Sequence, residues 1–154
     1  ETRLIDAASF CYVYFMRGPA PLLPDEPRSR ALYEYLDTLG PKTAAPALPM
    51  TLVLGNDEVP RGGKVRGEAV YRAACHGCHG DHTTGRGKNS PLASTLPNVA
   101  AEYPTLFPGT KPALVFIEKI RHGQFFEVGG NMPFYSTEAL SDEDLGALLT
   151  YLGQ

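Results

Sequence analysis

The sequence predicts an all-α protein, and three observations support this prediction. Apolar residues recur at spacings of three and four in several separate blocks, which is the period of an amphipathic helix. Glycine and proline end these blocks, as at Gly40-Pro41. Between the blocks, residues 41–63 show no helical period and carry too many prolines for a central strand.

The composition is that of an ordinary soluble globular protein. The chain has 154 residues, of which 43% are apolar and 20% charged, and its formal charge is −3. The acidic pI and the lack of a basic run argue against nucleic-acid binding. The sequence contains no stretch of about 18 consecutive apolar residues, which is the length that would predict a membrane span. Residues 7–16 are apolar but lack the basic leader of a signal peptide, so we expect a mature or processed form.

Residues 1–40 are predicted to form a first helical block. The helical spacing begins at Leu4 and is expected to end near Arg17-Gly18-Pro19. A proline-rich loop follows, and a second helix is expected from Ala31 to Leu39. Residues 41–63 are then predicted to be a linker, or a strap laid over the surface, with the apolar run 50–54 held against the following domain.

Residues 64–154 are predicted to form a second, all-α domain. Its first helix is expected from about Val65, and Pro112 lies where a helix can begin. The last helix is expected to begin at Ser141, because three carboxylates follow it where they favour the positive end of the helix dipole. The predicted buried stripe of this helix consists of Leu145, Leu148, Leu149 and Leu152.

The most specific motif is Cys75-His76-Gly77-Cys78-His79. C-x-x-C-H is the attachment signature of c-type haem, in which two thiols form thioethers to the porphyrin and the adjoining histidine ligates the iron. A zinc site using Cys75, Cys78 and His79 is an alternative, but neither a second C-x-x-C nor a later H-x-x-x-H supplies further ligands. A thioredoxin-like redox pair of cysteines is a second alternative, although the flanking sequences lack an alternation of strand and helix.

The layout of residues 64–154 resembles the class I cytochrome c family. In that family the first and last helices cross closely, with a glycine on one meeting an aromatic residue on the other. Gly67 and Tyr71, facing Leu148 and Tyr151, match that crossing. The resemblance implies a cytochrome c fold around one covalent haem c.

The resemblance also implies a second axial ligand, for which we select Met132. It lies in the glycine-rich run 129–134, shortly before the last helix, where the family carries its distal methionine. His122 is the alternative ligand. His76 and His82 are expected to face solvent. The other methionines are Met16 and Met50.

His79 is expected to need a partner for its second ring nitrogen, because such partners fix the tautomer of a ligating histidine. Proteins resembling this one use a backbone carbonyl at a proline after the motif. We therefore select the carbonyl of Pro91, with Leu92 packing on the ring.

Histidine and methionine together leave no open coordination position, which favours one-electron transfer over catalysis. No catalytic residue is predicted. The expected partners are redox proteins, either separate proteins or members of a larger complex. Residues 61–154 carry nine basic and nine acidic residues, so no steering patch points to a partner. The resemblance implies a periplasmic or otherwise extracytoplasmic location.

The first block repeats part of the second domain. Met16 and Met132 each precede a Tyr-Leu pair by 19 residues, and each pair ends an Ala-Leu-x-x-Tyr-Leu sequence, at 31–36 and 147–152. Residues 1–40 therefore look like the distal half of another cytochrome c domain that lacks its C-x-x-C-H.

The run from Cys11 through Met16 to Tyr35-Leu36 also resembles the end of the first domain of dihaem thiosulfate dehydrogenases and related sulfur-oxidising cytochromes. In those families a cysteine at this place can ligate the first haem. Cys11 therefore has two interpretations, a small buried hydrophobe or a ligand to a haem supplied elsewhere. The second implies an alternative function, haem-dependent oxidation of a sulfur compound.

Overall fold

The computed structural model describes residues 4–16, 18–40, 51, 53, 58–90, 93, 96–125, 128–129 and 132–154. The chain divides into two compact units, Glu1–Leu48 and Pro49–Gln154, called here the N-terminal and C-terminal units. In the part of the chain that is described, no helix is both long and apolar enough to cross a membrane.

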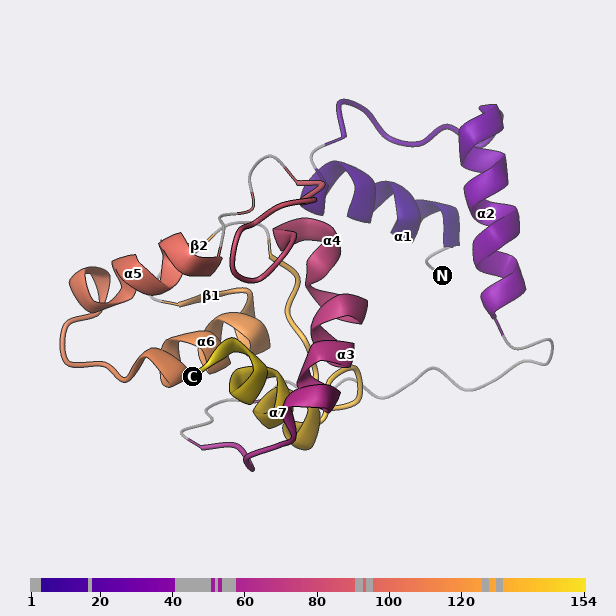
Figure 1. The fold of residues 1–154 in the computed structure, drawn as a ribbon. Helices are drawn as coiled ribbons and strands as arrows, with labels where there is room; N and C mark the ends of the chain where they lie inside the picture. The colour runs from indigo at the N-terminus through magenta and orange to yellow at the C-terminus, as the bar shows by residue number, and fades with distance from the viewer. Residues whose placement is uncertain are drawn as a thin grey trace. The chain divides into compact units, whose positions relative to one another are not determined.

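The N-terminal unit contains helix α1 (Leu4–Phe10), a turn of π-helix η1 (Cys11–Phe15) and helix α2 (Pro27–Leu39) (Figure 1). The two predicted helices are confirmed, with two differences. The first changes to π-helical hydrogen bonding at Cys11. The second begins four residues earlier than predicted, because Pro27 occupies its first turn, where a missing N–H costs nothing. The Ser9 hydroxyl donates to the Leu22 carbonyl at 3.1 Å and ties the following loop to α1.

The C-terminal unit is built from helices and confirms the all-α prediction. Its helices are α3 (Lys64–Ala74), α4 (His76–His79), α5 (Leu96–Leu106), α6 (Pro112–His122) and α7 (Asp142–Leu152). The predicted starts at Pro112 and Ser141 are confirmed, and the Ser141 hydroxyl accepts the Asp144 N–H as an N-cap. One small antiparallel ladder joins the two-residue strands β1 (Gln124–Phe125) and β2 (Val128–Gly129) within the described residues.

Helices α3 and α7 cross at close range (Figure 1). The contact depends on Gly67, because a Cβ there would overlap the carbonyl oxygen of Ala147 and lie 2.7 Å from the Cβ of Tyr151. The Tyr71 and Tyr151 rings then meet with centroids 5.6 Å apart. The predicted crossing is therefore confirmed, with Ala147 as the backbone that the glycine admits.

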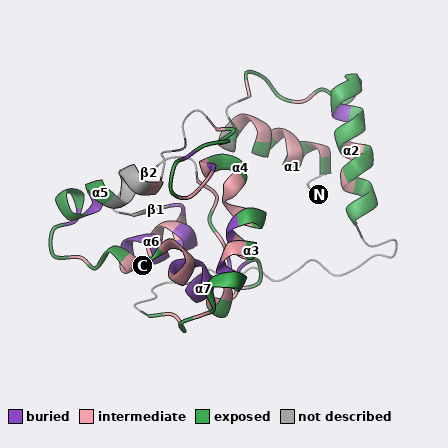
Figure 2. Cartoon of the chain, in the orientation of Figure 1, coloured by how far each residue is buried: buried purple, intermediate pink, exposed green. Residues whose placement is uncertain are grey.

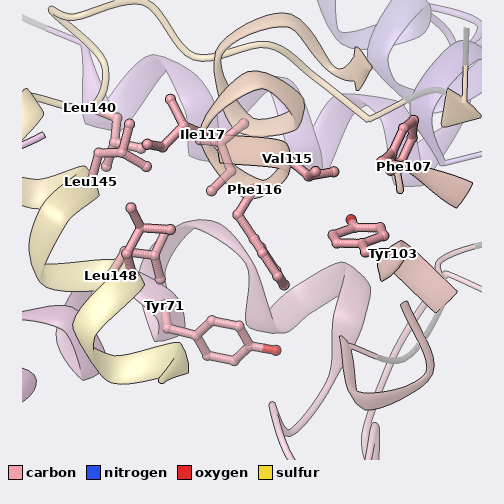
Figure 3. Close-up of a cluster of buried hydrophobic side chains, with 11 residues drawn as sticks. Tyr71, Tyr103, Phe107, Val115, Phe116, Ile117, Leu140, Leu145 and Leu148 are labelled. Carbon is pink, nitrogen blue, oxygen red and sulfur yellow. The ribbon is translucent and has the colours of Figure 1, made fainter. Parts of the chain in front are cut away.

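The core of the C-terminal unit lies between α3, α5, α6 and α7 (Figure 3). Phe116 projects from α6 toward Tyr103 of α5, and the two ring centroids are 5.3 Å apart. Leu145 and Leu148 of α7 are buried on the other side of the cluster. Figure 2 shows that α6 and α7 carry most of the buried surface, whereas α2 is almost wholly exposed.

Two parts of the C-terminal unit differ from the prediction. Helix α5 was missed, and it contains Pro104. The glycine-rich run predicted from Gly129 begins as strand β2. At the end of the predicted linker, Val59 packs against the core, and a Cβ at Gly62 would lie 2.5 Å from the Cα of Ala147. Thr51 and Val53 are described, but the rest of the apolar run 50–54 lies outside the described residues.

Candidate functional site

The cysteine motif forms a single helical turn directly after α3. The N–H of His79 donates to the Cys75 carbonyl at 3.0 Å, and the N–H of Cys78 donates to the same carbonyl at 3.2 Å. Cys75 is half-buried, while Cys78 is exposed. One helical turn therefore separates the two thiols, and the next residue is the histidine of the motif.

Burial changes the chemistry of Cys75. Burial, together with a smaller contribution from the neighbouring Cys78, raises the pKa of the thiol to about 12. A thiol with a raised pKa remains protonated at neutral pH, whereas redox-active pairs depend on a lowered one. The burial of Cys75 therefore argues against the thioredoxin-like alternative. In the ranges that the structure describes, no group of three or more His, Cys, Asp or Glu side chains is arranged to hold a metal ion.

The chain directly after His79 is fixed by two side chains. The Tyr71 hydroxyl donates to the Gly80 carbonyl at 2.6 Å, and this pair is buried. Asp81 accepts the N–H groups of Thr83 and Thr84 at 3.0 and 2.8 Å, and their hydroxyl groups as well. These hydrogen bonds stabilise the carboxylate and hold the pKa of Asp81 well below its usual range. The end of the motif is thus anchored to α3 and to its own loop.

Met132 lies on a segment that faces the cysteine turn. Its side chain is partly buried against the core, as is that of Cys75. Three residues later, the Tyr135 hydroxyl donates to the carbonyl of Ala74 at 3.0 Å. Burial raises the pKa of Tyr135 to about 12, and the nearby Cys75 and Cys78 thiols add to the shift. The segment that begins at Met132 therefore lies against the residues that begin the motif.

The remaining histidines each have neighbours. His122 Nε2 lies 3.2 Å from Glu118 Oε2, one helical turn away on α6. His82 Nδ1 is 2.8 Å from the Tyr151 hydroxyl, and their ring centroids are 4.3 Å apart. The expectation that His76 and His82 face solvent is wrong, because both are half-buried beside Tyr71.

Two further predictions have different outcomes. Pro91 and Leu92 lie outside the described residues, so the acceptor for His79 stays a prediction. Cys11 is exposed at the start of the π-helix η1, and its interpretation as a buried hydrophobe is therefore wrong.

A helical unit that carries a C-x-x-C-H turn has the attachment signature of the c-type cytochromes. The comparison with protein families agrees. The family described as "Cytochrome C oxidase, cbb3-type, subunit III" matches residues 64–152, which is more than half of the chain. The chain therefore belongs to this family of c-type cytochromes, whose function is haem-based electron transfer. No curated protein and no solved structure gave a match.

The described residues fit haem c. The donor set has the required chemistry, with two thiols one helical turn apart, an adjoining imidazole and a thioether. Cys75 and Met132 both pack against one cluster of buried apolar side chains. Phe134, two residues after Met132, is 45% exposed and offers further apolar surface beside it.

Three residues that hold the cysteine turn or the segment after Met132 were not recognised from the sequence in these roles. They are Tyr71, through its hydroxyl, Tyr135 and Arg121. Arg121 follows Ile117 and Ile120 on the buried stripe of α6, and a charged residue at such a position is the signal that was available.

Proposed function

We propose that the C-terminal unit binds one haem c through Cys75 and Cys78, with His79 and Met132 as its axial ligands. When bound, the haem supplies a one-electron redox centre whose two axial positions are both filled. The observation that carries the proposal is the contact between Tyr135 and Ala74, because it brings the Met132 segment to the start of the cysteine motif.

The protein residues would act as fixed ligands and walls. Cys75 and Cys78 would bind the porphyrin edge, while His79 and Met132 would close the iron from its two sides. The carbonyl of Pro91 would accept the second ring N–H of His79 and fix its tautomer. Because no ligand has to leave when the charge changes, the unit would relay electrons and exclude small molecules.

The physiological setting follows as part of the same proposal. The matched family is described as a subunit of a cytochrome c oxidase, which supports a role as a redox-complex subunit or as a carrier between redox proteins. Covalent haem attachment normally takes place outside the cytoplasm, so we infer a periplasmic or extracytoplasmic location.

Intact mass spectrometry of the protein, produced with a haem-attachment system, tests the covalent site. The expected mass is that of the polypeptide plus one haem, and a redox titration should follow a single one-electron step. The double variant Cys75→Ser, Cys78→Ser should lose the covalent haem, while Cys11→Ser keeps it. A bare polypeptide mass in the redox-active wild-type protein would refute the proposal.

A second candidate is oxidation of a sulfur compound such as thiosulfate, and one observation favours it. Cys11 is exposed and begins a π-helical turn, a feature that occurs frequently at functional sites. Met16, at the end of that turn, is also 59% exposed. Both side chains would be available to a haem supplied by another segment or chain.

Thiosulfate turnover with an artificial electron acceptor tests this second candidate. Activity that is lost in Cys11→Ala but kept in the exposed control Leu23→Ala would support it. If the wild-type protein turns over thiosulfate no faster than Cys11→Ala does, the candidate is rejected.

A further inference from the structure

Arg121 is a buried cation at the end of α6, and its partners lie together on one segment. Its side chain is 1% exposed. Its Nη1 donates to the carbonyls of Tyr135 at 3.1 Å, Ser136 at 3.2 Å and Leu140 at 2.7 Å. Its Nη2 lies 2.6 Å from Asp142 Oδ1 at the start of α7. One guanidinium therefore fixes four positions of the segment 135–142.

This arrangement cannot be reproduced by a smaller or apolar side chain. A buried carbonyl without a donor is costly, and removal of Arg121 would take this donor from the carbonyls of Tyr135 and Leu140. The Ser136 carbonyl would keep the Leu140 N–H at 2.9 Å. Lysine keeps the charge, but its single ammonium group lacks the planar fork that reaches both the carbonyls and the carboxylate. The conformation of residues 135–142 therefore depends on the arginine itself.

Tyr135 links the same segment to the other side of the site. Its backbone N–H donates to the Ile120 carbonyl at 3.0 Å, beside Arg121 on α6. Its hydroxyl donates to the Ala74 carbonyl at 3.0 Å, next to Cys75. The tyrosine thus spans from α6 to the cysteine turn.

The segment also contacts α6 at Met132. Gly123 ends α6 in the left-handed conformation with φ 77°. A Cβ at Gly123 would overlap the Met132 carbonyl oxygen, so the glycine admits the backbone of Met132 at this place. Contacts at both ends of the stretch 132–135 therefore restrict where the methionine can move.

We propose that Arg121 and Tyr135 are positioning residues that hold Met132 in place as the ligand, so that the sulfur resists displacement from the iron. The proposal rests on the proposed function, because it assumes that Met132 is the axial ligand. It goes further by assigning the strength of that ligation to two side chains that do not touch the metal. Loss of either one frees the segment to open and exposes the iron to external ligands.

Imidazole binding to the ferric protein tests the proposal, because imidazole competes with the methionine for the iron. Tyr135→Phe removes one hydrogen bond without creating a cavity, and Arg121→Lys keeps the charge but loses the fork. Each should bind imidazole about tenfold more tightly than wild type, since one lost buried hydrogen bond favours opening to about that extent. Haem content should remain one per chain.

Two control variants separate positioning from general stability. Arg66→Lys makes the same exchange at an exposed arginine, whose Nε lies 2.6 Å from Asp144 Oδ1. Leu148→Ala destabilises the core from α7, outside the segment 132–142, by removing a side chain that is 1% exposed. Both should bind imidazole as wild type does, although Leu148→Ala unfolds more readily. Imidazole affinity that follows global stability across the variants would overturn the proposal.

The variant Met132→Ala distinguishes a failure of the ligand assignment from a failure of the positioning role. If it binds imidazole more tightly while Tyr135→Phe and Arg121→Lys do not, the ligand assignment stands and the positioning role is refuted. If Met132→Ala binds imidazole as wild type does, the ligand assignment fails and the positioning role fails with it.

Discussion

The same six-residue pattern, Ala-Leu-x-x-Tyr-Leu, has opposite environments in the two units. In α7 it spans 147–152, and Leu148 is 1% exposed. In α2 it spans 31–36, where Leu32 is 38% and Tyr35 60% exposed. The two helices have similar local sequences, so the difference arises from what each packs against.

The partner of α7 is α3, and Gly67 is the residue that makes the close contact possible. Among the described residues, the N-terminal unit has only α1, η1 and α2 as helical elements, and α1 has no buried residue. A periodic apolar pattern therefore predicts a helix, but burial of its apolar face depends on a second helix with matching shape.

The methionines follow the same contrast. Met16 precedes α2 by 11 residues and Met132 precedes α7 by 10 residues, so the two loops are nearly equal in length. Met16 is nevertheless 59% exposed, whereas Met132 is partly buried beside the core that Cys75 also borders. We therefore expect Met132, and not Met16, to act as the ligand in the C-terminal unit.

The largest expected difference between the units is at the leucine of the pattern. Leu148→Ala should destabilise the C-terminal unit by about 2–5 kcal/mol, because it removes a fully buried side chain and leaves a cavity. Leu32→Ala, at the equivalent position of α2, should cost less than about 1 kcal/mol. Denaturant unfolding followed by circular dichroism measures both. Equal losses would contradict the contrast in packing.

The second prediction concerns the contact that buries α7. Gly67→Ala should destabilise the unit by about 1–3 kcal/mol, because the added Cβ meets the backbone of Ala147 and forces the helices apart. The control Gly63→Ala places its Cβ in open space and should cost less than about 1 kcal/mol, the size of an N-cap substitution. A shift in thermal midpoint of the same size in both variants would argue against the close crossing.

The tyrosine of the pattern should give a smaller effect. Tyr151→Phe removes the hydrogen bond to His82 and should cost about 0.5–1.5 kcal/mol. In α2, no hydrogen bond of the Tyr35 hydroxyl is among those found for the described residues, and Tyr35→Phe should be close to neutral. Thermal unfolding of the two variants compares them directly. A larger loss for Tyr35→Phe would indicate that α2 has a partner that buries this face.

The smallest expected effect is a pH dependence of stability that arises at the start of the C-terminal unit. The Thr51 hydroxyl donates to Glu138 Oε1 at 2.5 Å and the Thr51 N–H donates to Oε2 at 2.9 Å, and these two bonds lower the pKa of Glu138 from 4.5 to about 2. Because the folded-state pKa is lowered, the contribution is fully present above pH 4.5 and is lost as pH falls toward about 2. The stability advantage of wild type over Glu138→Gln should therefore shrink over this range. The variant Thr51→Val should show a weaker pH dependence than wild type, and an unchanged one would contradict the pairing.

Local signals in the sequence predicted much of the fold. Ser141 with the three carboxylates after it, and Pro112, located helix starts because capping and proline geometry act within one turn. Helix α5 was missed because Pro97 and Pro104 interrupt its pattern, although Tyr103 is buried on it and Phe107 is buried directly after it. Here tertiary packing outweighs the local preference against proline.

The candidate site divides in the same way. The motif at 75–79 is contiguous, so its spacing alone predicted its chemistry. The roles of Tyr135 and Arg121 depend on contacts with residues far along the chain, such as Ala74. From the sequence alone, an arginine is predicted to lie at the surface, because charged side chains are rarely buried unless they are paired.

The central claim is most directly tested by the visible spectrum of the ferric protein. Ligation by methionine gives a sulfur-to-iron charge-transfer band at the red end of the spectrum. Met132→Ala should lose this band, while the matched variant Met16→Ala should keep it unchanged. A band that persists in Met132→Ala, or one that disappears in Met16→Ala, would contradict the assignment of the haem site to the C-terminal unit with Met132 as its ligand.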